Sequence, residues 1–116
     1  MGGWPSELRV SQDKRSLTII FDDGVSYAHP AEYLRVVSPS AEVQGHSPEQ
    51  RQTVPGKSDV EIMKLDPVGN YAVRITFTDM HDTGIFSWTY LREIGEEYDQ
   101  RWAAYLEELE EKGLSR

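Results

Sequence analysis

Apolar and polar residues alternate in two short stretches of the chain, 17–21 and 73–77, which begin 56 residues apart. A period of two predicts β-strands with one buried face. Each stretch leads into a turn that contains Asp, and the triplet Tyr-Leu-Arg follows further on, starting at Tyr33 and at Tyr90. The triplets are 57 residues apart, so one residue has been inserted between the turns and the triplets. The pattern predicts a duplicated unit of strand, turn, strand and helix.

In the first unit we expect three strands and a helix, at Leu8–Val10, Leu17–Phe21, Val25–Ala28 and Ala31–Val37. Gly24 completes a tight turn after the second strand, because glycine readily adopts the positive φ that such turns need. Pro30 suits the first helical position, where its missing N–H costs nothing, and Pro39 ends the helix. The stretch 38–57 has almost no apolar residues, which predicts a mobile loop.

The second unit is expected to contain strands at Asp59–Leu65, Tyr71–Phe77 and Thr83–Phe86 and a helix at Ser87–Ile94. The segment 66–70, Asp-Pro-Val-Gly-Asn, is rich in residues that favour turns and separates the first two strands. Ser87 can cap the helix, because its hydroxyl accepts a hydrogen bond from a free backbone N–H. Gly95 is expected to end this helix.

A last helix is predicted at Glu96–Lys112, with Gly113 as its end. Its apolar residues recur at helical spacing: Tyr98, Trp102, Tyr105, Leu106 and Leu109. We expect this stripe to pack on the sheet of its own domain. Two large aromatic side chains also suit a contact with a second copy of the chain, a homodimer, or with a partner protein.

These elements predict an α+β fold: pseudo-duplicated β-hairpin, strand and helix units that form an antiparallel-rich sheet, followed by an amphipathic acidic C-terminal helix. Residues 1–94 form the duplicated part and residues 95–116 the helix. A chain of 116 residues is long enough for one modest hydrophobic core.

Charge and composition exclude several function classes. The formal net charge of −8 disfavours nucleic acid, because binding a phosphate backbone needs a basic face. No apolar run reaches the roughly 20 residues of a membrane-spanning helix, and the N-terminus does not resemble a secretory signal, so we expect a cytoplasmic protein. The absence of cysteine removes disulfides, thiolate metal ligands and cysteine nucleophiles.

Two histidines lie where each unit turns or passes from strand to helix. His81 is in the second turn, between Asp79 and Asp82, and His29 precedes the first helix. One interpretation is that these imidazoles bond to nearby backbone or carboxylates. The alternative is a zinc or iron site formed by His81, Asp79, Asp82 and His29, since imidazole and carboxylate suit both metals. No Gly-x-Ser-x-Gly elbow and no phosphate-binding glycine loop occurs, so we expect no enzymatic activity.

Arg35 and Arg92 occupy equivalent positions in the two Tyr-Leu-Arg triplets. Each arginine can either cap the C-terminus of its own helix or bond across to an Asp turn. The sequence leaves both arrangements open.

The string His81-x-x-Gly84-Ile-aromatic-x-Trp88, which ends in Tyr90-Leu-Arg, resembles the gamma-butyrobetaine hydroxylase-like N-terminal domain family. The similarity extends from about residue 8 to residue 94. In that family the domain stands alone in small bacterial proteins of unknown function. It is also fused to iron–sulfur-carrier ATPases, and it precedes the catalytic domain of 2-oxoglutarate and iron dioxygenases.

In the dioxygenases of the family the domain is a zinc module, with three cysteines after a Trp-Leu-Arg segment and a distant histidine. The resemblance places the cysteine positions at Ser38, Ser40 and Val43 and the histidine at His81. Structural zinc takes four ligands, commonly thiolates and imidazoles, and valine offers no donor. The resemblance therefore implies that this chain lacks the zinc of the family and needs no cofactor.

The resemblance implies a small non-enzymatic accessory or interaction module, linked to iron–sulfur or metalloenzyme maturation. Six residues are candidates for its interaction surface: His81, Trp88, Arg35, Arg92, Trp102 and Tyr105. The alternative function is a metal-binding module for zinc or iron that uses His81 with other His or Asp ligands.

Overall fold

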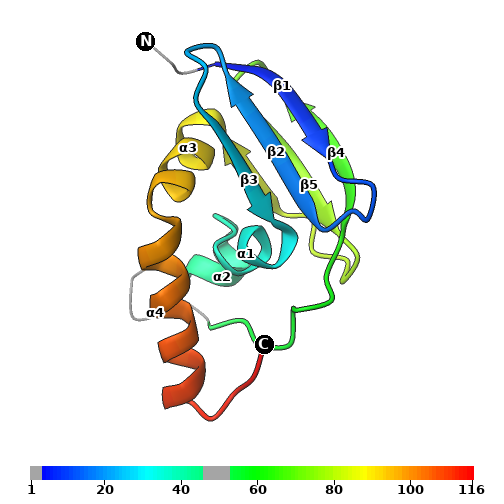
Figure 1. Cartoon of the computed structure of the whole chain (residues 1–116). Coiled ribbons are helices and arrows are strands. Elements are labelled where there is room, and N and C mark those ends of the chain that lie inside the picture. Colours follow the sequence, from blue (N-terminus) through cyan, green and yellow to red (C-terminus); the bar gives the residue numbers. More distant parts are fainter. Residues whose placement is uncertain (1–3, 46–52) are drawn as a thin grey trace.

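A computed structural model describes residues 4–45 and 53–116. Its elements in chain order are β1 (Pro5–Val10), β2 (Ser16–Phe21), β3 (Ser26–Pro30), α1 (Ala31–Val36), α2 (Ala41–Gln44), β4 (Ile62–Val68), β5 (Ala72–Phe77), β6 (Gly84–Ser87), α3 (Trp88–Glu96) and α4 (Tyr98–Glu111). Figure 1 shows the strands at one end of the molecule and α4 extending from the other. The predicted α+β class with a C-terminal helix is confirmed.

The strands form two sheets, one for each repeat, where the sequence had suggested one. The first has the order β1-β2-β3 and the second β4-β5-β6, and all pairs are antiparallel. Each sheet is a meander closed by short turns, so its three strands find their partners locally. The inward faces of both sheets then share a single core.

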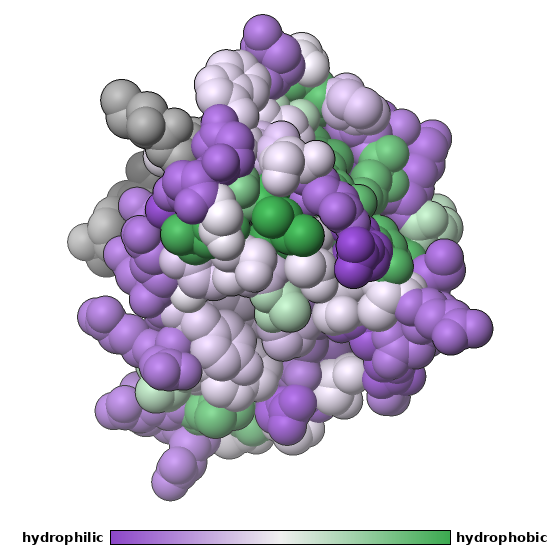
Figure 2. Space-filling model, turned by 45° about the horizontal axis from the view of Figure 1, so that its top comes forward, coloured by the Kyte–Doolittle hydropathy of each residue, from purple (hydrophilic) through white to green (hydrophobic). Residues whose placement is uncertain are grey.

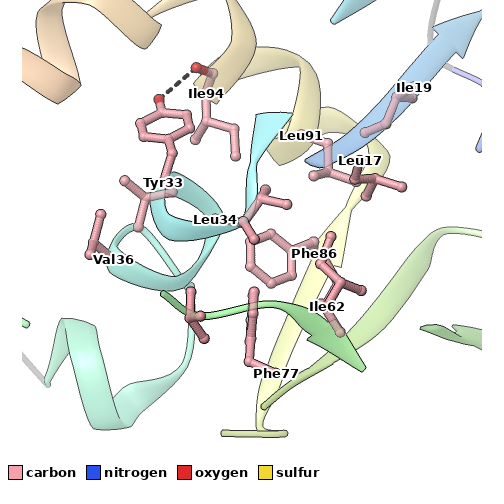
Figure 3. Close-up of a cluster of buried hydrophobic side chains, with 14 of the residues drawn as sticks. Leu17, Ile19, Tyr33, Leu34, Val36, Ile62, Phe77, Phe86, Leu91 and Ile94 are labelled. Atoms are coloured by element: carbon pink, nitrogen blue, oxygen red, sulfur yellow. Dashed lines mark hydrogen bonds between the residues drawn. The ribbon is translucent and has the colours of Figure 1, made fainter. Parts of the chain in front are cut away.

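That core confirms the alternation read from the sequence. Leu17, Ile19 and Phe21 of β2 and their counterparts in β5 are at most 2% exposed. Figure 3 shows side chains from both repeats converging in this core, among them Phe77 and Phe86. The residues that alternate with them are Thr18 and Ile20 in β2 and Arg74 and Thr76 in β5. On the face seen in Figure 2 the apolar surface is broken into small patches between hydrophilic residues.

The two repeats match in detail. The amide of Phe21 donates to the carbonyl of Val25 (2.8 Å), and the amide of Phe77 donates to the carbonyl of His81 (2.9 Å). The third turn residue has a positive φ in both, 89° at Gly24 and 71° at Met80. Met80 therefore adopts a backbone conformation that favours glycine.

The tyrosine of each triplet reaches the helix of the other repeat. The Tyr33 hydroxyl donates to the carbonyl of Ile94 (2.6 Å), as the dashed line in Figure 3 shows. The Tyr90 hydroxyl donates to the carbonyl of Val37 (2.5 Å). Val37 and Ile94 are themselves 57 residues apart, so the two bonds are equivalent and exchanged between the repeats.

The arginines follow the same exchange. Both terminal nitrogens of Arg92 donate to Asp23 (3.2 and 2.8 Å), and Nε of Arg35 donates to Asp79 (2.8 Å). The guanidinium of Arg92 also lies 5.1 Å from the centroid of the Phe21 ring. Of the two arrangements considered, the bond across to the Asp turn of the other repeat is the one adopted.

Several element boundaries differ from those predicted. β4 runs through Pro67 into the expected turn, which an edge strand tolerates because its outer N–H groups need no partner. Helix α3 continues through Gly95 to Glu96. Glycine is needed there for packing: a Cβ at Gly95 would lie 2.6 Å from the ring of Tyr27.

The first part of the predicted loop 38–57 is structured. Ser40 caps α2 by accepting a hydrogen bond from the amide of Glu42 (3.1 Å), and Val43 of that helix is 1% exposed. The buried valine and the capping serine both stabilise this short turn of helix. Residues 46–52 of the predicted loop lie outside the described residues.

The last helix docks on its own domain, but on α1 rather than on a sheet. Tyr98 and Trp102 pack edge-on against the Tyr33 ring, with centroid distances of 4.8 and 6.2 Å. Beyond the helix, the guanidinium of Arg116 pairs with the buried carboxylate of Glu32 at 2.7 Å. Within the described residues, no helix combines the length and apolar character needed to cross a membrane.

Replacing either exchanged tyrosine by phenylalanine should lower stability. Tyr33→Phe or Tyr90→Phe leaves a carbonyl without its partner, which costs about 1–2 kcal/mol of unfolding free energy. The Tyr71→Phe variant is the control, because Tyr71 is 55% exposed and its change should stay within about 0.5 kcal/mol. Urea unfolding measures all three. A loss in the control as large as in the other two would contradict the role given to the exchanged bonds.

Candidate functional site

A buried polar cluster joins the start of α2 to the strand β6. Ser38 Oγ lies 3.0 Å from Nε2 of His81, and these residues are 0% and 5% exposed. Ser38 Oγ also accepts a hydrogen bond from the amide of Ser40 (3.3 Å). The serine hydroxyl can donate one hydrogen bond and accept two, so the direction of the bond to Nε2 of His81 is set by the imidazole tautomer.

The cluster continues from Ser40 to the surface. Ser40 Oγ and Thr83 Oγ1 are 2.6 Å apart, and Thr83 Oγ1 donates to Oε1 of Glu42 (2.5 Å). The same carboxylate oxygen lies 3.7 Å from Nδ1 of His81. The hydroxyls and the imidazole are therefore paired with each other, and the exposed residues Thr83 and Glu42 connect them to the exterior.

The cluster is possible because the two repeats carry different residues at two pairs of equivalent positions. Gly84 corresponds to Tyr27, and Ser38 corresponds to Gly95, both at an offset of 57. In one half the Tyr27 ring packs on Gly95, whereas in the other a Cβ at Gly84 would lie 2.5 Å from Ser38 Oγ. The missing ring at Gly84 leaves the room that the His81 imidazole and the serine hydroxyls fill.

Burial and nearby charges set the protonation of this region. Burial lowers the pKa of His81, and the positive charge of Arg35 lowers it further. For Asp79, burial alone raises the pKa, but hydrogen bonds from Lys57, Arg35 and the His81 amide outweigh it and bring the pKa to about 2. At neutral pH we therefore expect a neutral imidazole beside an ionised, doubly paired Asp79.

In space, Ser38, His81 and Glu42 lie next to one another as the three residues of a serine hydrolase triad do. The surroundings of Ser38, however, differ from those of a catalytic serine. A nucleophilic serine must be reached by its substrate, and Ser38 is 0% exposed. Ser38 Oγ is already engaged by the Ser40 amide. The arrangement is one of packing and mutual hydrogen bonding.

The same cluster occupies the positions that the resemblance assigned to zinc ligands. Ser38, Ser40 and His81 come together as that resemblance requires, and Val43 is buried one turn after Ser40. Neutral hydroxyls and a valine do not fit zinc, which takes thiolate, imidazole or carboxylate ligands. One imidazole alone cannot hold the ion.

His29 lies in a separate environment. Its Nε2 atom donates to the carbonyl of Leu91 (3.1 Å), and its ring stacks between Tyr27 and Tyr33. The alternative metal set of His81, Asp79, Asp82 and His29 does not assemble: across 4–45 and 53–116, no three His, Asp or Glu side chains are placed to hold an ion together. Burial lowers the pKa of His29 to about 4.

The six candidate interaction residues do not form one exposed surface. His81 and Tyr105 are buried, and Arg35 and Arg92 are held by the Asp turns. The other two are the half-buried tryptophans: Trp88 donates from Nε1 to the carbonyl of Asn70 (2.9 Å), and Trp102 stacks on Tyr98. Their aromatic and charged character serves contacts within the chain.

Sequence reasoning missed the parts of the cluster that lie outside the recognised motif. Glu42 and Thr83 were not singled out, although they connect the cluster to the exterior. The alignment of the two repeats carries the signal that could have found the site, because Tyr27 and Gly84 are unequal residues at equal positions. A size difference of this kind marks where the internal symmetry fails.

The fold and the cluster define a class of protein: a duplicated α+β domain whose halves exchange contacts around one shared core. The sequence profile described as gamma-butyrobetaine hydroxylase-like, N-terminal, matches residues 8–92. The chain belongs to this family, which confirms the resemblance seen in the sequence.

Solved structures agree with this assignment. Two proteins whose structures were determined in solution by NMR are 43% and 39% identical to this chain, both with a TM-score of 0.84. The alignments cover 100% and 98% of this chain and 91% and 85% of those proteins. A crystal structure from Acidithiobacillus ferrooxidans, of a DUF971 family protein with unknown function, is 36% identical with a TM-score of 0.67, and the alignment covers 80% of this chain and 93% of that protein. No curated protein matches the chain.

The buried His29 predicts a loss of stability in acid. The unfolded imidazole takes up its proton near pH 6.5 and the folded one near pH 4, so folding loses up to about 3 kcal/mol as the pH falls through that window. The His29→Phe variant, which copies Phe86 at the equivalent position, should show a shallower decline in urea unfolding between pH 7 and 4.5. An unchanged slope would contradict this, and the part of the slope that remains is expected from His81.

Restoring cysteines should create a zinc site. A variant with Ser38→Cys, Ser40→Cys and Val43→Cys supplies three thiolates beside His81, and we expect it to bind one Zn²⁺ and to gain thermal stability. The same variant with His81→Ala is the control and should bind more weakly. Zinc titration followed by metal analysis measures both. Equal zinc content in the triple variant and the parent protein would contradict the assignment of these positions.

Proposed function

We propose that this chain is a small non-enzymatic interaction module whose cluster around Ser38 and His81 replaces a metal as the centre of the fold. The observation that carries the proposal is that Ser38, Ser40 and His81 are at most 5% exposed and are hydrogen-bonded to one another. A group that is sealed and satisfied in this way stabilises a scaffold and has no capacity left for a substrate or an ion.

The surface offered to a partner is the outward side of α4. Leu106 is 39% exposed there, and acidic side chains of the same helix are exposed around it: Asp99, Glu107, Glu110 and Glu111. Arg101, the basic residue of this helix, is turned back onto Glu97 (2.8 Å) and Glu93 (3.3 Å). We call this surface the acidic face of α4. It lies outside the family profile, which ends at residue 92, but the alignments with the two NMR structures cover 100% and 98% of this chain.

The pathway that we propose for the module is iron–sulfur or metalloenzyme maturation. Its support is the family resemblance, since related domains are fused to iron–sulfur-carrier ATPases. This step is an analogy with the fused relatives.

A matched pair of surface variants tests the docking surface. Leu106→Ser on α4 and Ile85→Ser on β6 each remove one exposed apolar side chain, and these residues are 39% and 45% exposed. We expect the first to weaken binding of a partner captured with the parent protein by about tenfold, which corresponds to roughly 1.4 kcal/mol, and the second to leave it unchanged. Calorimetry with the purified partner measures both.

The same variants report on a homodimer. If the occupant of the acidic face of α4 is a second copy, light scattering should give a dimer mass for the parent protein and a monomer mass for Leu106→Ser. Equal partner affinity and equal mass for both variants would refute the proposed surface.

A further inference from the structure

A cleft of about 260 Å³ lies between β3 and the junction of α3 with α4. Its walls come from both repeats and from the C-terminal helix, and the residues that matter here are Tyr27, His29, Gly95, Glu96, Tyr98 and Asp99. The cleft is the counterpart of the Ser38 cluster, because Tyr27 and Gly95 are the residues equivalent to Gly84 and Ser38. The cleft therefore lies at the position in one half of the fold that the polar cluster occupies in the other half.

The inner wall of the cleft contains a buried acceptor with no partner. His29 is 2% exposed, and its Nε2 atom is engaged with the carbonyl of Leu91. A carbonyl can only accept, so the imidazole proton is on Nε2 and Nδ1 carries a lone pair. Within 4–45 and 53–116, no protein group bonds to Nδ1. Burial, which lowers the pKa of His29 to about 4, keeps this nitrogen an acceptor at neutral pH.

The outer walls add negative charge and aromatic rings. Glu96 and Asp99 border the cleft, Tyr27 and Tyr98 contribute their rings, and no Lys or Arg is among its described lining residues. Carboxylates attract cations. Asp99 lies in the first turn of α4, where its charge offsets the positive end of the helix dipole.

One cation of the chain lies near this charge. Nε of Arg92 is 3.8 Å from a carboxylate oxygen of Glu96, at the outer limit of an ion pair. The terminal nitrogens of Arg92 are directed to Asp23 instead. Glu96 itself is 58% exposed along its side chain, so it remains accessible to a further donor.

We propose that this cleft takes the guanidinium or ammonium group of an Arg or Lys side chain presented by a partner protein. Such a group supplies several N–H donors to walls that provide an imidazole acceptor and carboxylates. The inference rests on the proposed function, because it names the chemistry of the partner that the interaction module binds.

The acidic face of α4 favours a basic protein segment over a free small molecule. Asp99 belongs both to the cleft and to that face, and Glu107, Glu110 and Glu111 continue the negative charge along the helix. A chain with one Arg in the cleft and further basic residues beside α4 would match this distribution. Complementary charge of this kind raises association rates and selects the partner.

A pair of small probes tests the cleft directly. Amide signals of the full protein are followed by NMR during titration with Nα-acetyl-arginine amide and, as the uncharged isostere, with Nα-acetyl-citrulline amide. We expect saturable shifts at Tyr27, Gly95 and Tyr98 with the arginine probe alone. The double variant Glu96→Gln, Asp99→Asn should reduce its affinity by at least about fivefold, or roughly 1 kcal/mol.

A second double variant controls for net charge. Glu110→Gln, Glu111→Gln removes the same two charges from α4 outside the cleft and should leave the affinity within about twofold. The proposal is overturned if both probes shift the same signals, if the shifts spread over α4 without saturating, or if the two double variants weaken binding equally. Thermal unfolding of each variant verifies that the fold is intact.

The outcome is separable from that of the proposed function. A captured partner that depends on Leu106 but is insensitive to Glu96→Gln, Asp99→Asn would retain the interaction module and discard the cleft as its anchor. Specific binding of the arginine probe without any partner dependence on Leu106 would retain the cleft and discard the docking surface.

Discussion

The exchange of hydrogen bonds between the two Tyr-Leu-Arg triplets is the constraint on which the rest of the fold depends. Each tyrosine donates to a carbonyl near the end of the other repeat's helix, Ile94 or Val37, while each arginine holds the other repeat's Asp turn. The leucine between them, Leu34 or Leu91, is fully buried. Three successive residues thus tie a helix end, the core and a turn of the opposite half. Neither repeat can satisfy its polar groups alone, so the two halves form one cooperative unit.

Within this symmetric frame the functional features arise where the two halves differ. Replacement of a ring by Gly84 makes space for a sealed polar cluster around His81, whereas the retained Tyr27 ring forces Gly95 into α3. A cleft lies beside His29, in the half that contains the Tyr27 ring. The two halves of a duplicated fold keep equivalent core residues, because close packing penalises changes there. They differ at positions where a large side chain can be exchanged for a small or polar one.

The buried cluster and the cleft support complementary parts of the proposed function. The cluster provides a centre in which every hydroxyl and the imidazole are paired, which is the condition for burying polar groups without loss of stability. The cleft and the acidic face of α4 present acceptors and negative charge toward the exterior. A module with a rigid interior and an acidic, partly apolar outer helix is suited to recognising a basic protein surface.

The sequence by itself determined the repeat, the alternating strands, the caps at Ser87 and the membership of the family, because these features depend on local periodicity and on motif residues. The sequence predicted where α4 lies along the chain but not that it packs on α1. It also left open whether Arg35 and Arg92 cap their own helices or bond to the Asp turn of the other repeat. Only the tertiary structure decided that the repeats exchange these side chains, that the strands divide into two sheets, and that His29 and His81 occupy separate sites. Such choices depend on which surfaces meet across separations of 44 to 69 residues, and no local pattern encodes that geometry.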